Sequence, residues 1–76
     1  MAFYTVKTSP LAAVQQTPEQ NAPGVETVPV LPGGIGLRHA DSKLETIEQG
    51  DYVVLLDSGD KLRVQKNVFE ALFKPV

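Results

Sequence analysis

Apolar and polar residues follow their clearest pattern in the last third of the chain. Residues 52–56 form a short run of β-branched, aromatic and aliphatic side chains, and residues 61–65 alternate polar with apolar. Both patterns are typical of β-strands. Turn-forming residues fill 57–60, where Gly59 can take the positive φ that a tight turn needs. The pattern therefore predicts a β-hairpin with strands at 52–56 and 61–65.

The spacing of the apolar residues also predicts the register of this hairpin. A loop of two or four residues places Leu55 opposite Leu62 and Val53 opposite Val64. One face of the hairpin is then wholly apolar, and a shift by one residue would scatter this set. We expect this register.

A short helix is predicted directly after the hairpin, at 68–73. Asn67 suits its N-cap, and Glu70 follows three residues later as in a capping box. Four of the six residues are large and apolar and lie on one side of the helix, and Pro75 ends the helix near Lys74. So short a helix does not persist alone. We expect it to cover the apolar hairpin face and to form the stability nucleus, at about 1.5–3 kcal/mol for each large side chain buried.

The first half of the chain is predicted to be extended and rich in loops. Five of the six prolines lie between Pro10 and Pro32. We expect 17–34 to be a flexible Pro/Gly-rich segment inside a single small domain, 1–76. Short strands are predicted at 3–8, 11–15 and 35–39, and an edge strand or irregular segment at 25–31.

Residues 41–49 suit two structures. Ser42 with Glu45 is close to a capping box, and Leu44 and Ile47 suit a helix. The stretch 44–47 also suits a brief strand, so both interpretations remain open here. With either one, the elements predict an α+β fold: a small, mostly antiparallel β-sheet with a C-terminal hairpin and one short C-terminal helix.

Length and composition narrow the functional classes. A chain of 76 residues forms one domain with one small core, and at this size only about 60 % of the surface is buried on folding. It has no cysteine, which excludes disulfides and thiolate metal sites. The net charge of −2 argues against nonspecific binding to nucleic acid or to an anionic membrane. The longest strictly apolar run, 53–56, is far too short to span a membrane. We expect a cytoplasmic protein that is monomeric when free.

No motif predicts catalysis, a cofactor or a metal. The glycine-rich stretch 33–36 lacks the spacing of a phosphate-binding loop and is interpreted as a turn. His39 and Asp41 suggest a base with its orienting carboxylate, but the chain has no second histidine, so a surface histidine is favoured. Asp57 and Asp60 are interpreted as turn residues that bind backbone N–H groups.

Two groups of residues are candidates for binding a partner. An apolar segment near the N-terminus suits β-augmentation of a partner's sheet. A set of basic residues around the second hairpin strand suits electrostatic steering. The candidate partner-binding residues are Phe3, Tyr4, Val6, Lys7, Arg38, Lys61, Arg63 and Lys66.

Several short motifs match a known pattern. They are Pro10, Ala13-Val14-Gln15, Thr17, Asn21, Leu44-Glu45, Gly50-Asp51-Tyr52-Val53-Val54 and Phe69-Glu70-Ala71-Leu72-Phe73-Lys74-Pro75-Val76. In this pattern the chain resembles a group of short proteins encoded by tailed bacteriophages and prophages. The resemblance favours a strand at Leu44-Glu45. It departs at Asn21-Ala22-Pro23-Gly24, where the family has a helix, and nothing transfers to the segment 24–34.

The resemblance implies a phage origin. Small phage proteins often dock on a large host machine, and inhibitors of bacterial RNA polymerase are a well-populated class. We therefore expect a non-enzymatic protein-binding module in the host cytoplasm that inhibits or redirects a host complex, with RNA polymerase as the leading target. The alternative is a minor virion or assembly component.

Overall fold

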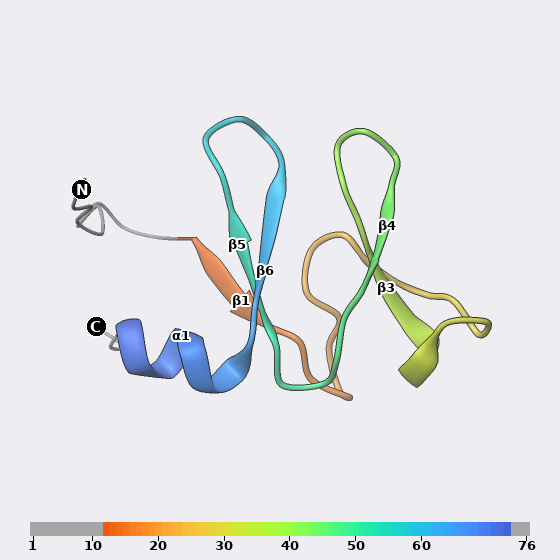
Figure 1. The fold of residues 1–76 in the computed structure, drawn as a ribbon, viewed down its shortest axis with the longest axis horizontal. Coiled ribbons are helices and arrows are strands. Elements are labelled where there is room, and N and C mark those ends of the chain that lie inside the picture. Colours follow the sequence, from red (N-terminus) through yellow and green to blue (C-terminus); the bar gives the residue numbers. More distant parts are fainter. Residues whose placement is uncertain (1–11, 74–76) are drawn as a thin grey trace, which may run out of the picture.

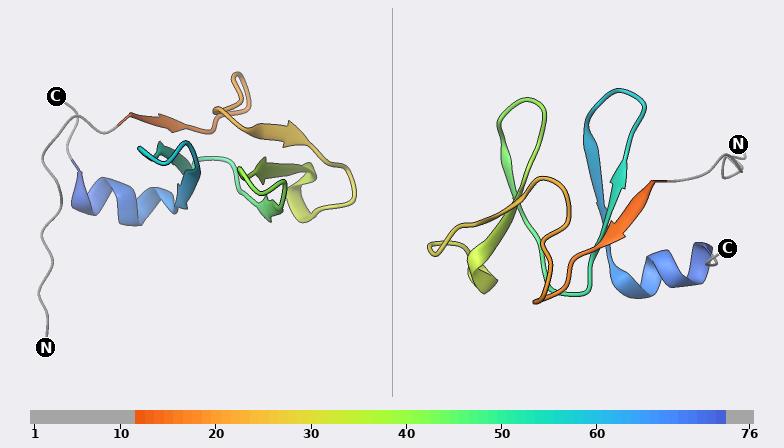
Figure 2. Two further views of the ribbon diagram at one scale, coloured as in Figure 1. Left: turned by 90° about the horizontal axis from the view of Figure 1, so that it is seen from above. Right: turned by 180° about the vertical axis from the view of Figure 1, so that it is seen from behind.

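The computed structural model describes residues 12–73 (Figures 1 and 2). Within this range the chain forms two three-stranded antiparallel sheets and one short α-helix. The α+β class is therefore confirmed, although two small sheets replace the single sheet expected. The strand expected at 3–8 lies outside the described residues.

Each sheet is built from one hairpin and one additional strand. The first sheet has the order β1-β5-β6, and the second has the order β2-β3-β4. The bounds of the six strands are β1 Ala13–Gln15, β2 Val25–Thr27, β3 Ile35–Arg38, β4 Leu44–Thr46, β5 Tyr52–Leu55 and β6 Lys61–Val64. A single 3-10 turn, η1 (Pro32–Gly34), precedes β3, and the helix α1 (Lys66–Leu72) follows β6.

The ambiguous stretch at 41–49 contains a strand. β4 pairs with β3, so that Leu44 lies opposite Arg38 and Thr46 opposite Gly36. Ser42 has a φ of 71° and lies in the tight turn between the two strands instead of capping a helix. Pairing with a central strand decides the structure here, because the local propensity for helix is weak.

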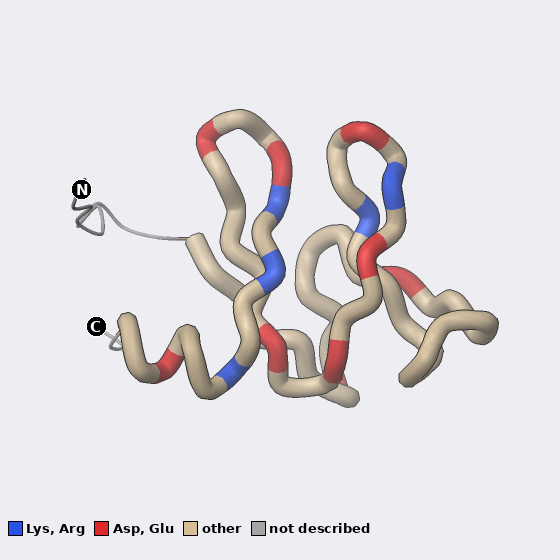
Figure 3. The backbone as a smooth tube through the Cα atoms, in the orientation of Figure 1, with Lys and Arg blue, Asp and Glu red and all other residues tan. Residues whose placement is uncertain are grey.

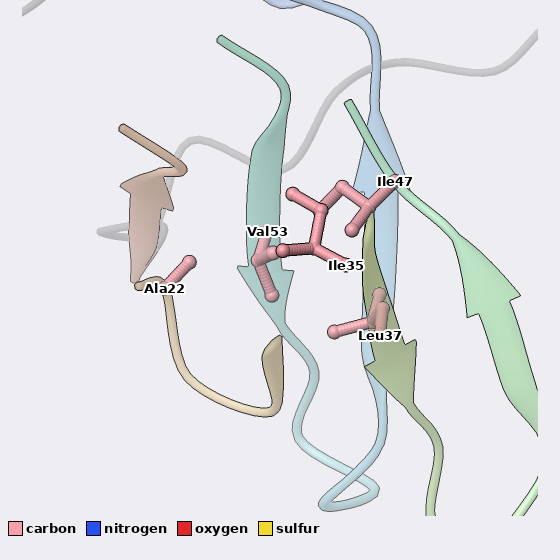
Figure 4. Packing of buried hydrophobic residues seen from close by; sticks show 5 residues of the cluster. All are labelled: Ala22, Ile35, Leu37, Ile47 and Val53. Atoms are coloured by element: carbon pink, nitrogen blue, oxygen red, sulfur yellow. The ribbon is translucent and has the colours of Figure 1, made fainter. Parts of the chain in front are cut away.

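The hydrophobic core lies between the two sheets (Figure 4). Its buried residues are Ala22, Ile35, Leu37, Ile47 and Val53, with Val14 and Val25 packed against them. Leu37, Ile47 and Val53 are completely inaccessible to solvent. The core thus takes side chains from β3, from β5, from the loop before β2 and from the residue after β4, and it joins the two sheets.

The predicted hairpin forms, but its predicted register is wrong by one residue. Val54 lies opposite Leu62, and Val53 lies opposite Arg63. The cause is a three-residue loop. The Leu56 N–H donates to the Asp60 carbonyl at 2.9 Å, and the Gly59 N–H donates to the Leu56 carbonyl at 3.0 Å. Gly59 has a φ of 88°, as in a three-residue hairpin loop that ends in a bulge. Because the loop has an odd number of residues, Leu62 pairs with Val54 and lies on the face of the hairpin that points away from Val53.

The helix begins and packs differently from the prediction. It starts at Lys66, and Gln65 occupies the N-cap position without a side-chain hydrogen bond. Asn67 is therefore already helical, and its Oδ1 accepts only the neighbouring Val68 N–H, at 3.0 Å. None of the helical residues is fully buried, and α1 extends from the end of β6 away from the second sheet (Figure 1). The helix is not the stability nucleus, because the core lies between the sheets.

Gly24 joins the loop before β2 to the core, and its geometry leads to a testable prediction. Its φ is 82°, and a Cβ atom placed there would lie 2.7 Å from Cδ of Lys61. We expect Gly24→Ala to lower the free energy of unfolding by about 1–2 kcal/mol through backbone strain alone, with a smaller added loss because the end of the flexible Lys61 side chain must move. Urea denaturation of the purified variant measures this loss.

Gly59→Ala is the matched control for this variant. Gly59 has a similar φ of 88°, but no atom lies within 4 Å of the position of an added Cβ. It therefore reports the backbone strain without the contact. A Gly24→Ala variant that loses no more stability than Gly59→Ala would contradict the close approach of Lys61.

Candidate functional site

The first sheet has one face in the core and one face away from it. Side chains alternate between faces along a strand, so Val53 points into the core and Tyr52 and Val54 point to the other side, where Val54 is itself only 4 % exposed. The pairing of Val54 with Leu62 and of Tyr52 with Val64 places four apolar or aromatic side chains on that side. We call it the outer face (Tyr52, Val54, Leu62, Val64). Leu62 is 50 % exposed there.

An aromatic stack attaches the helix to the outer face. The rings of Tyr52 and Phe69 are stacked with centroids 3.9 Å apart and an interplanar angle of 10°, and Phe73 lies 4.7 Å from Phe69. The Tyr52 hydroxyl donates to Glu70 Oε2 at 2.9 Å. This hydrogen bond to Glu70, together with partial desolvation, raises the pKa of Tyr52 above its ordinary value. The helix is therefore held by its Phe69/Phe73 side.

The stripe next to Phe69 and Phe73 on the helix surface remains open to solvent. Val68 and Leu72 are four residues apart and so lie on one helical stripe. Leu72 is 60 % exposed. Together with the outer face they form the apolar surface, which we define as the outer face plus Leu56, Val68, Phe69 and Leu72. It contains four of the six large apolar side chains that are exposed among residues 12–73; the four are Leu56, Leu62, Val68 and Leu72.

The basic residues expected to steer a partner are mostly engaged within the chain. Arg38 donates to Glu26 Oε1 at 2.6 Å and to the Ser42 carbonyl at 2.7 Å. Its hydrogen bond with Glu26 lowers the pKa of that carboxyl and raises the pKa of Arg38. Arg63 donates through Nε to Asp51 Oδ2 at 2.6 Å. These two arginines thus have partners already.

The predicted partner-binding residues are not brought together into one patch. Arg38 belongs to the second sheet, whereas Lys61 and Arg63 lie on β6 and Lys66 begins α1. Acidic residues also lie along both hairpins (Figure 3). The aliphatic part of the Lys61 side chain lies against Gly24. The other four predicted residues, Phe3, Tyr4, Val6 and Lys7, lie outside the described residues.

A cluster of three ionisable side chains joins the two hairpins, and its composition was not predicted. His39 Nε2 lies 2.7 Å from Glu45 Oε1, and His39 Nδ1 lies 3.1 Å from Asp60 Oδ1. Asp41, the partner suggested by the sequence, accepts the Lys43 N–H instead. His39 and Asp60 are 21 residues apart, so no local spacing signals their contact. Asp60 also accepts backbone N–H groups, as expected for a turn residue.

A buried glutamine organises the loop after β1. The side chain of Gln16 is fully buried; its Oε1 accepts the Ala22 N–H at 2.7 Å, and its Nε2 donates to Asn21 Oδ1 at 2.9 Å. These bonds hold the loop closed and place Ala22 in the core. Thr17 Oγ1 accepts the Gln20 N–H at 3.2 Å, so the residues 17–20 form a turn. The sequence alone does not signal this role for Gln16.

Comparison of the chain with protein-family models, with curated proteins and with solved structures finds no match. Function therefore has to be argued from the geometry. Among residues 12–73, no three His, Cys, Asp or Glu side chains converge in a way that could hold a metal ion. Nor does this part of the chain contain a helix with the length and apolar character needed to cross a membrane.

Proposed function

We propose that the chain is a phage-encoded, non-enzymatic protein-binding module that docks on a host protein complex in the cytoplasm and inhibits or redirects it. The observation that carries this proposal is the apolar surface on the first sheet and α1. Scattered single apolar residues are normal on a protein surface, whereas a group of them marks an interaction site. Here they share one sheet face and the helix attached to it.

The composition of the apolar surface suits a protein partner. Aromatic and large aliphatic residues dominate the energetics of interfaces, and the Tyr52–Phe69 stack is already ordered before a partner arrives. Removing one exposed leucine from water stabilises a complex by roughly 1.5–3 kcal/mol when the partner covers it fully. Because Arg38 and Arg63 form ion pairs within the chain, we assign affinity to the apolar side chains and not to the basic residues.

The target is proposed from the resemblance to small phage proteins. Such proteins often act by docking on a large host machine, and bacterial RNA polymerase is the first complex to test. The resemblance rests on the hairpin motif at 50–54 and on the C-terminal motif at 69–76. Both motifs contribute to the apolar surface, since Tyr52 and Phe69 form its aromatic stack.

We expect Leu62→Asp to weaken binding to purified RNA polymerase at least tenfold, because it places a charge in the centre of the proposed interface, and a factor of ten corresponds to about 1.4 kcal/mol. Val30→Asp is the matched control, since Val30 is 90 % exposed and lies outside the apolar surface. The measurement is the dissociation constant of the immobilised full chain with the polymerase, followed by promoter-dependent transcription with and without the chain.

The circular dichroism spectrum of each variant checks that it remains folded. The target is rejected when wild-type chain at micromolar concentration neither binds the polymerase nor changes transcription. The assignment of the surface is rejected when Leu62→Asp binds as tightly as Val30→Asp.

A further inference from the structure

The turn between β3 and β4 and the loop between β5 and β6 lie at the same end of the molecule (Figure 1). Asp60, at the end of the second loop, connects them. Its Oδ1 accepts the Lys61 N–H at 2.7 Å and the Ala40 N–H at 3.1 Å, and it lies 3.1 Å from His39 Nδ1. The Asp60 carboxylate thus contacts its own β5–β6 hairpin and two successive residues of the β3–β4 hairpin, His39 and Ala40.

His39 completes this connection from the β3–β4 hairpin. Its other ring nitrogen, Nε2, lies 2.7 Å from Glu45 Oε1 on β4. Both neighbours of the imidazole are carboxylate oxygens, which accept hydrogen bonds. A neutral imidazole has one N–H donor and one lone pair, whereas the imidazolium has two N–H donors. Only the charged form can donate to Glu45 and Asp60 together.

We propose that His39, Glu45 and Asp60 form a pH-dependent clasp between the two hairpin tips, closed while His39 is protonated and released when it loses its proton. Without the proton, one ring nitrogen would present a lone pair to a carboxylate oxygen. Among the described residues, Asp60 makes one other bond to the β3–β4 hairpin, from the Ala40 N–H. This bond then breaks together with the contact to the His39 ring. The core between the sheets keeps the domain folded, so release is confined to the tips.

The other charged groups near the clasp do not replace its partners. On the β3–β4 hairpin, Arg38 is paired with Glu26, and Lys43 lies 4.0 Å from Asp41. On the β5–β6 hairpin, Lys61 is directed toward Gly24, and Asp57 is exposed in the loop. The clasp therefore holds one cation between two anions, and deprotonation of His39 leaves the two anions facing a neutral ring.

The pH window of the clasp follows from the two pKa shifts. The hydrogen bonds that His39 donates to Glu45 and then to Asp60 raise its pKa above 6.5, so its contribution is complete below pH 6.5 and is lost as the pH rises through the higher folded-state value. Bonds from the Lys61 and Ala40 N–H groups and from His39 lower the pKa of Asp60 below 3.8. Its contribution is complete above pH 3.8 and is lost as the pH falls through the lower folded-state value. The clasp is therefore closed between the lowered pKa of Asp60 and the raised pKa of His39.

The single histidine of the chain makes the proposal directly measurable. In the full-length protein, NMR titration of the His39 ring and of the Ala40 amide is followed from acidic to alkaline pH. We expect the ring to titrate above pH 6.5 and the Ala40 amide shift to move with the same midpoint. Glu45→Gln and Asp60→Asn are each expected to lower the His39 midpoint, and His39→Gln to abolish the alkaline step at Ala40.

Asp57→Asn is the matched control, since it removes the same charge from the same loop as Asp60→Asn without touching the clasp. It should leave both midpoints within about 0.2 pH units of the wild type, because exposed charges are screened by salt. The proposal is overturned by a His39 midpoint that Asp60→Asn and Asp57→Asn change equally. It is also overturned by an Ala40 amide that does not follow the ring. Glu45→Gln leaves both backbone bonds of Asp60 in place, so it tests the clasp even in the event that Asp60→Asn does not fold.

Discussion

Leu37→Ala is expected to lower the free energy of unfolding by about 2–5 kcal/mol, the usual cost of truncating a buried leucine. Leu37 has no exposed surface and lies on the central strand of the second sheet, in the core that joins the two sheets. Domains of this size have little stability to spare. We therefore expect a large unfolded fraction at 37 °C, measured by urea denaturation and by thermal melting.

Leu72→Ala removes the same atoms from the helix and serves as the control. Leu72 is 60 % exposed, so its loss is expected to change the free energy of unfolding by no more than about 0.5 kcal/mol. The pair of variants distinguishes a core between the sheets from a core under the helix. Equal losses for Leu37→Ala and Leu72→Ala would contradict the structure and support the packing that the sequence predicted.

Asp51→Ala is expected to lower the free energy of unfolding by roughly 3 kcal/mol, at the lower end of the range for breaking a buried ion pair because Arg63 keeps some contact with water. The Asp51 side chain is 5 % exposed and that of Arg63 is 21 % exposed. Asp51 Oδ2 accepts the Arg63 Nε–H at 2.6 Å and the Glu48 N–H at 3.0 Å. Truncation leaves both donors without this partner, and urea denaturation measures the cost.

Two further variants identify the cause of this loss. Glu26→Ala breaks the Arg38–Glu26 pair, which has the same N–O distance of 2.6 Å but is exposed, so a much smaller loss is expected. The double variant Asp51→Ala/Arg63→Met removes the unpaired cation and should recover part of the stability. A loss from Glu26→Ala as large as that from Asp51→Ala would show that burial does not determine the cost.

The apolar surface and the clasp lie on different parts of the molecule, and their tests are independent. The apolar surface covers the side of the first sheet away from the core, whereas the clasp joins the hairpin tips through His39. A chain that fails to bind RNA polymerase still tests the clasp by NMR. A clasp that fails leaves the apolar surface unchanged.

Local sequence determined where the main elements form. The strands at 52–55 and 61–64 and the helix after them were predicted to within two residues, because alternation, turn formers and helical spacing are properties of neighbouring residues. The short strands at 13–15 and 35–38 were predicted for the same reason. The α+β class followed from this order of elements.

The candidate site was predicted only in part. Sequence reasoning selected Arg38, Lys61, Arg63 and Lys66 for their charge, but the carboxylates that engage both arginines come from other strands and loops. It also interpreted His39 as a surface histidine, because its partners on β4 and in the distant loop cannot be read from spacing. Charge is visible in a sequence, whereas the pairing of charges is a property of the folded chain.

By itself, the sequence therefore determined the set of local elements and their order. The tertiary structure decided the register of the β5–β6 hairpin, where one additional loop residue exchanged the faces of Leu62 and Arg63. It decided that 44–46 is a strand, because β3 offered a partner. It also placed the core between the sheets and left the helix at the edge. The physical reason is that burial depends on contacts between segments that are distant in the chain, and these contacts outweigh the weak preferences of a few neighbouring residues.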